Sequence, residues 1–105
     1  MYTQITRDEG VMKFDLTCIV KKEGEQYSSL CLELDVASCG KTRKQAIESL
    51  KDAIETYIQY MTEENRKEEI FRPVSIEELH EFLTEGAKLE ELCSFNVYPL
   101  EFSYA

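Results

Sequence analysis

The feature that most constrains this chain is a run of apolar residues from position 46 to 61, spaced by three and four. Such spacing places the side chains on one face of a helix. Thr42 stands three residues before Gln45 at the start of the run, which is the pattern of a helix capping box. A helix with one long apolar face needs a second layer to cover, so we expect it to lie across a sheet. The apolar positions are Ala46, Ile47, Leu50, Ala53, Ile54, Tyr57, Ile58 and Met61.

The residues before this helix predict the sheet. Apolar and polar residues alternate over residues 12–20, as in a half-buried strand, and Gly24 marks a turn. Residues 27–36 then predict a second strand of a hairpin, and residues 36–40 a short third strand. We expect Leu30, Leu32 and Leu34 on one face of the second strand, with Tyr27 and Cys31 on the other. Whether Cys18 and Cys31 are neighbours depends on the register, which the pattern leaves open.

The last third of the chain predicts a short helix and a strand. Ser75 and Glu78 form a second capping box, and the helix should run over residues 76–85 and stop at Gly86. Its apolar positions are Ile76, Leu79, Phe82 and Leu83. The tail alternates from Phe95 to Tyr104 as one strand, or as two strands broken at Pro99. The predicted fold is one α+β domain, in which residues 1–72 form a sheet-plus-helix core and residues 73–105 complete it.

Charge and composition limit the possible partners. The 105 residues carry a net charge of −9, and residues 73–105 hold 1 basic and 7 acidic residues. Such a chain gains little from counterion release, so we expect no direct nucleic-acid binding, whereas a basic protein partner fits. No apolar run is long enough to cross a membrane, and the first residues lack the pattern of a signal peptide. We therefore expect a cytoplasmic protein.

No residue pattern predicts catalysis, a metal site or a cofactor. The four cysteines, Cys18, Cys31, Cys39 and Cys93, form no C-x-x-C pair, and free thiols are expected. Glu33 and Asp35, two apart on the predicted strand, should point the same way, but no further acidic cluster is placed to join them in holding Mg²⁺. His80 lies among glutamates without a nucleophile nearby. The expectation is a protein that is not an enzyme.

One alternative function is the binding of a small anion at the start of the long helix, where backbone N–H groups attract negative charge. The spacing does not match a nucleotide-binding loop. The residues concerned are Gly40, Lys41, Thr42, Arg43 and Lys44.

The run "CLELDVASCGKTRKQAIESLKDAIETYIQYM", residues 31–61, resembles the HicB-like antitoxin family. The strand–Gly–Thr–helix phrase carries the resemblance through Glu33, Asp35, Gly40 and Thr42, and Ala46, Leu50 and Ala53 match the family's helix. The preceding strand also fits, so about half of the chain is covered. Residues 73–105 resemble no DNA-binding module, which indicates a short form of the family.

The resemblance implies a β-β-β-α-β core similar to a partial ribonuclease H fold without its catalytic carboxylates. It also implies a role as an antitoxin that binds and blocks HicA, a small basic RNA-cleaving toxin, or as an orphan relative with another basic partner.

Self-association is a further expectation. The predicted sheet leaves apolar surface and an open strand edge, which a two-fold dimer would cover. The alternative is that the short second helix covers this surface. The residues expected at or near the dimer contact are Leu30, Leu32, Phe95, Val97, Leu100 and Phe102.

Overall fold

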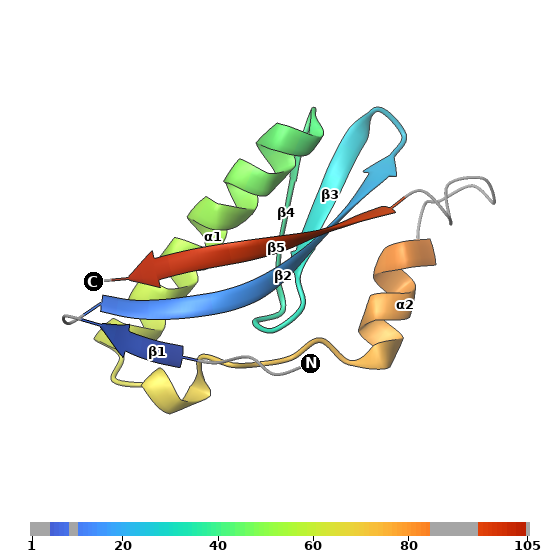
Figure 1. The fold of residues 1–105 in the computed structure, drawn as a ribbon. Coiled ribbons are helices and arrows are strands. Elements are labelled where there is room, and N and C mark those ends of the chain that lie inside the picture. The colour runs from blue at the N-terminus through green and yellow to red at the C-terminus, as the bar shows by residue number, and fades with distance from the viewer. Residues whose placement is uncertain (1–4, 9–10, 85–94, 105) are drawn as a thin grey trace.

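The computed structural model describes residues 5–8, 11–84 and 95–104 (Figure 1). The elements run β1 (Ile5–Asp8), β2 (Val11–Glu23), β3 (Gln26–Cys31), β4 (Val36–Gly40), α1 (Arg43–Glu63), the 3-10 helix η1 (Lys67–Glu69), α2 (Ile76–Thr84) and β5 (Phe95–Tyr104). This order confirms the α+β class, the hairpin, the third strand and both helices. No helix in the described part of the chain has the length and apolar character that a membrane crossing needs.

Strand β2 is the centre of a five-stranded antiparallel sheet. One of its edges pairs with β5 over its length, and the other pairs with β1 near its start and with β3 near its end. β4 then pairs with β3. The hairpin between β2 and β3 turns at Gly24, whose φ of 64° favours glycine. Strand β1 was not predicted from the sequence.

Helix α1 covers one face of this sheet (Figure 1). Thr42 caps it as predicted, since its hydroxyl accepts a hydrogen bond from the Gln45 N–H at 3.0 Å. Five of the predicted apolar positions are buried, and the main chain is tied to the sheet where Ser29 Oγ donates to the Ala46 carbonyl at 2.8 Å. The buried helix residues are Ala46, Leu50, Ile54, Ile58 and Met61. They pack on β2 residues Phe14, Leu16, Cys18 and Val20.

Gly40 sits where β4 ends against the first turn of α1. A Cβ at this position would lie 2.6 Å from the Ala46 nitrogen and 2.8 Å from the Gln45 Cβ. The glycine in the strand-to-helix phrase therefore allows a close approach of two backbone segments.

The second strand ends earlier than predicted. β3 stops at Cys31, and residues 32–35 form a turn in which Asp35 has a positive φ of 54°. The expected division of faces is consequently wrong: Leu30 lies on the sheet face away from α1, whereas Leu34 is in the turn and belongs to the core under α1. Glu33 and Asp35 do not share a strand.

Helix α2 packs on the face of the sheet away from α1. Ser75 caps it, accepting a hydrogen bond from the Glu78 N–H at 3.1 Å as the capping box predicted. Leu79, Phe82 and Leu83 are half-buried, but Ile76 is 87% exposed, so its assignment to the apolar face was wrong. The predicted stop at Gly86 lies outside the described residues.

The tail is one continuous strand, with Pro99 in its middle. Pro99 is opposite Thr17, and the Thr17 N–H and C=O both bond on the other edge of β2, to Glu33 Oε1 and to the Leu32 N–H. Residue 99 therefore needs no N–H to bond β2, because its ring nitrogen faces the outer edge of β5. A proline at such an edge position is tolerated and does not break the strand.

The predicted dimer residues do not form one surface. Leu30 is 4% exposed and Leu100 is 5% exposed, and Phe102 packs against the core. Leu100 and Phe102 face the core because β5 lies beside β2, whereas Leu30 lies on the opposite face of the sheet, beside α2. Leu32 is half-buried, whereas Val97 is 56% exposed. The side chain of Phe95 lies outside the described part.

Candidate functional site

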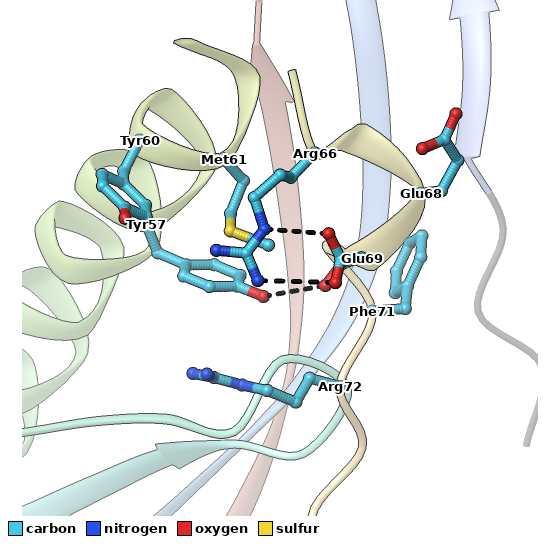
Figure 2. Close-up of a pocket in the computed structure, with 8 residues that line it drawn as sticks. All are labelled: Tyr57, Tyr60, Met61, Arg66, Glu68, Glu69, Phe71 and Arg72. Atoms are coloured by element: carbon cyan, nitrogen blue, oxygen red, sulfur yellow. Dashed lines mark hydrogen bonds and ion pairs between the residues drawn. The ribbon is translucent and has the colours of Figure 1, made fainter. Parts of the chain in front are cut away.

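A hollow of about 570 Å³ lies beside the C-terminal end of α1 (Figure 2). We call it the tyrosine–arginine pocket. Helix α1, η1 and the segment that follows η1 all contribute to it. Its lining residues are Tyr57, Tyr60, Met61, Arg66, Glu68, Glu69, Phe71 and Arg72.

The end of α1 places Arg66 at this pocket. Asn65 adopts a left-handed conformation with φ of 58°, its N–H bonds the Thr62 carbonyl, and the Arg66 N–H bonds the Met61 carbonyl at 2.7 Å. These two bonds are those of a Schellman motif, in which asparagine can replace the usual glycine. The chain thus turns back on the helix, and η1 follows directly.

Tyr57 connects the helix to the segment after η1. Its hydroxyl donates a hydrogen bond to the Ile70 carbonyl at 2.7 Å, and burial is the largest cause that raises its pKa. The Arg72 guanidinium stacks over the Tyr57 ring at 5.0 Å and also bonds the Leu34 carbonyl through Nε at 3.3 Å. Arg72 therefore holds the turn after β3 against the helix end.

Arg66 and Glu69 face each other across η1 (Figure 2). Nε lies 2.8 Å from a carboxylate oxygen, and the hydrogen bond from Arg66 lowers the pKa of Glu69 while the same bond raises that of Arg66. Both side chains are largely exposed, so the pair contributes little to stability. Glu68 points away from this pair in the figure, which leaves the aromatic side of the pocket open.

The pocket is lined mainly by aromatic residues, arginine and methionine. Tyrosine, arginine, methionine and phenylalanine are the residue types enriched in the contact regions of protein interfaces. Tyr60 is 52% exposed, and it is one of the few large apolar side chains on the described surface with that exposure. Two guanidiniums and two carboxylates balance each other, so the pocket has no preference for an anion.

The start of α1 was the predicted anion site, and the structure places its residues in internal contacts. The Lys41 N–H donates to Gln45 Oε1 at 3.1 Å, and Thr42 accepts from the Gln45 N–H. Arg43 bonds Asn96 Oδ1 at 3.0 Å and lies over the Tyr27 ring at 4.8 Å. Lys44 is exposed, and Gly40 is packed against the helix. Much of the hydrogen-bonding capacity at this helix start is therefore used within the protein, by the capping box and by the contacts of Arg43.

Glu33 has a structural role. It is 7% exposed, and its carboxylate accepts hydrogen bonds from the Thr17 N–H and hydroxyl. Asp35 is half-exposed in the turn, and His80 is exposed on α2. Nowhere in the described ranges do three His, Cys, Asp or Glu side chains converge as metal ligands do.

Cys18 and Cys31 lie directly opposite each other on β2 and β3, which answers the question that the register left open. Both are free and buried, and burial raises their pKa values to about 11 and about 12. Such thiols are poor nucleophiles at neutral pH. Cys39 is free and exposed, and Cys93 lies outside the described residues.

Comparison with protein families, with curated proteins and with solved structures gives no match to this chain. The tyrosine–arginine pocket was not predicted from the sequence either. Asn65 just after the helix is the signal that would have indicated a turn back on the helix end. The position of Arg72 over Tyr57 had no sequence signal, because it depends on a contact between distant segments.

Proposed function

We propose that this protein is a non-enzymatic, protein-binding domain of the HicB-like kind, which binds and blocks a small basic RNA-cleaving toxin similar to HicA. The observation that carries the proposal is the phrase from Cys31 to Met61, with its Gly40 and Thr42 at the strand-to-helix change. Its fit with the fold supports the proposal: Gly40 permits the close approach of β4 to α1, and Thr42 caps the helix.

The order of the described elements also supports a core similar to a partial ribonuclease H fold. Three successive antiparallel strands, β2, β3 and β4, are followed by α1, and β5 returns to lie beside β2. Glu33 is one of the residues that match the family phrase. Its carboxylate accepts hydrogen bonds from Thr17 on β2, so we propose that its role is to stabilise the sheet. A binding role in the cytoplasm, with no catalysis and no direct contact to nucleic acid, is in keeping with the net charge of −9.

We further propose that the tyrosine–arginine pocket is part of the surface that contacts the partner. Tyrosine and arginine are, with tryptophan, enriched among the few residues that dominate the binding free energy of protein interfaces. Tyr60 is the residue to test, because its side chain is exposed and is not part of the hydrophobic core, so its substitution should leave the fold intact.

The experiment uses the product of a short basic reading frame adjacent to the gene. Both proteins are co-expressed, and the purified toxin is assayed for RNA cleavage with and without one equivalent of this protein. We expect a stable complex and loss of cleavage, with weaker inhibition by Tyr60→Ala than by the control Tyr98→Phe. Absence of a complex at micromolar concentration, or RNA cleavage by this protein itself, would overturn the proposal.

A two-fold dimer is also proposed. Val97 is the exposed apolar residue that supports it, and the outer edge of β5 is unpaired among the described strands. Pro99 removes one donor from that edge, so the contact should use the Val97 face of β5 more than strand-to-strand hydrogen bonding.

A further inference from the structure

A second hollow, about 240 Å³, lies between α2 and the sheet face away from α1. We call it the acid-rimmed pocket. Strand β3, the turn after it, the segment before α2 and α2 itself each contribute to it. Its lining residues are Leu30, Asp35, Val74, Glu78, Glu81 and Phe82.

The lining divides into an apolar part and a charged part. Leu30 is 4% exposed, and Val74 and Phe82 are half-buried, so these three form an apolar floor. Asp35, Glu78 and Glu81 supply three carboxylates, and none of the described lining residues is basic. The Arg72 guanidinium bonds the Asp35 carbonyl oxygen at 3.5 Å and lines the tyrosine–arginine pocket.

Helix α2 already contacts a lysine of this chain. Lys21 is 4% exposed on the sheet face under α2, and its ammonium lies 5.0 Å from the centre of the Phe82 ring. A cation over an aromatic face is attracted by the ring quadrupole, and the aliphatic stem of lysine packs well on apolar surface. Phe82 therefore serves a cation within the fold and also lines the acid-rimmed pocket.

Size narrows the choice of occupant. Pockets that enclose drug-sized ligands start at roughly 300 Å³, so the acid-rimmed pocket suits one side chain. An aliphatic stem fits the floor of Leu30, Val74 and Phe82, and a cationic end then meets the carboxylates. We propose that the acid-rimmed pocket receives a lysine or arginine side chain of the basic protein partner. The identity of that partner rests on the proposed function; the preference for a cation with an apolar stem does not.

The pocket is tested first with small probes. The ¹⁵N-labelled protein is titrated with the blocked amino acids N-acetyl-lysine methylamide and N-acetyl-arginine methylamide, and with the norleucine analogue as the neutral control. We expect saturable shifts of the Leu30, Val74 and Phe82 amide signals with a cationic probe, and at least about threefold weaker binding of norleucine, as for the loss of one or two exposed ion pairs. Equal response to norleucine, or no response to either cation, would overturn the proposal.

The charge requirement is tested with Glu78→Gln/Glu81→Gln. Glutamine keeps the side-chain size, and the cap of α2 is retained because it uses the Glu78 backbone N–H. The matched control is Glu48→Gln/Glu55→Gln, which makes the same change of net charge on exposed positions of α1. Only the first variant should weaken binding of the cationic probe; equal weakening by the control would mean that net charge alone acts, and the site would be refuted.

The two proposals fail separately. If the toxin binds, and the variant Glu78→Gln/Glu81→Gln binds both the probe and the toxin as well as the wild type does, the pocket proposal is refuted and the antitoxin role stands. If the lysine probe binds through the carboxylates but no basic toxin forms a complex, the pocket stands and the antitoxin role fails. A response to Mg²⁺ or Ca²⁺ alone, without one to the lysine probe, would assign the carboxylates to a metal ion instead and overturn the inference.

Discussion

Glu33, in the turn after β3, bonds Thr17 at the edge of β2 that also pairs with β1 and β3. Its two carboxylate oxygens accept hydrogen bonds from the Thr17 N–H at 2.7 Å and from the Thr17 hydroxyl at 2.8 Å. This contact lies between the part of β2 that pairs with β1 and the part that pairs with β3. A side chain from the turn after β3 thus completes the edge of the sheet.

Removing this carboxylate should destabilise the fold. Glu33→Ala removes the carboxylate that accepts hydrogen bonds from the Thr17 N–H and hydroxyl, and we expect the free energy of unfolding to fall by about 2–4 kcal/mol, with about 1–2 kcal/mol for Glu33→Gln. Urea unfolding followed by circular dichroism measures both. The control Glu25→Ala, at an exposed position of the hairpin, should change it by less than about 0.5 kcal/mol. Equal stability of Glu33→Ala and Glu25→Ala would contradict this role.

The two glycines that shape the fold should respond differently to alanine. Gly40→Ala forces a Cβ against the Ala46 nitrogen and should cost about 1–3 kcal/mol. Gly24→Ala meets no atom within 4 Å, but its positive φ should cost about 1–2 kcal/mol. Hydrogen exchange separates the causes: the Ala46 amide should exchange faster in Gly40→Ala only. Unchanged exchange at the start of α1 would argue against the close approach.

The buried thiols predict a loss of stability at high pH. Burial raises the pKa of Cys18 to about 11 and that of Cys31 to about 12, from an ordinary value of 9.0. Both thiols are neutral in the folded and unfolded chain below pH 9, so their contribution to stability is fully present there. Above pH 9 the unfolded chain releases protons that the folded chain retains, and the contribution is lost as the pH rises towards 11 and 12.

Two measurements check this prediction. The urea midpoint should fall between pH 9 and 11, and by less in the double variant Cys18→Ala/Cys31→Ala than in the wild type. At pH 8, iodoacetamide should modify Cys39 quickly and leave Cys18 and Cys31 unmodified until the chain unfolds, as read by peptide mass spectrometry. Rapid modification of Cys31 in the folded protein would show that the thiol is accessible.

Two substitutions on β5 separate assembly from folding. Val97 is exposed and Leu100 is buried, so Val97→Asp should leave the folded monomer intact and abolish a dimer, whereas Leu100→Asp should unfold the domain by placing a charge in the core. Sedimentation at micromolar concentration and circular dichroism report the two effects. A 12.2 kDa species for the wild type at every concentration would refute the dimer.

The parts of the fold that sequence patterns predicted are those with local causes. The capping boxes at Thr42 and Ser75, the helical stripe and the turn at Gly24 each depend on residues within a few positions of one another. β1 was missed because its four residues, Ile5–Asp8, form a strand only through pairing with β2. Its length is too short for an alternating pattern to be distinguished.

The errors have a physical origin in contacts between distant segments. "ELD" looks like a strand continuation, but the chain turns there because Arg72 bonds the Leu34 carbonyl and Glu33 reaches Thr17. Leu100 and Phe102, which were predicted at the dimer contact, pack in or against the core. An apolar pattern in the sequence does not distinguish core residues from interface residues. The acid-rimmed pocket combines residues 30–35 with residues 74–82, which are far apart in the chain, so no local signal marks it.

The pairing of β2 with β5 has a consequence for biosynthesis. The central strand β2 leaves the ribosome well before β5 (Phe95–Tyr104), the strand that pairs along one of its edges. Until then the hairpin and α1 can associate, while Phe14 and Leu16 lack the neighbours Phe102 and Leu100. The nascent chain therefore carries an uncovered edge of β2 until β5 emerges, and a chain truncated before β5 would be prone to aggregate.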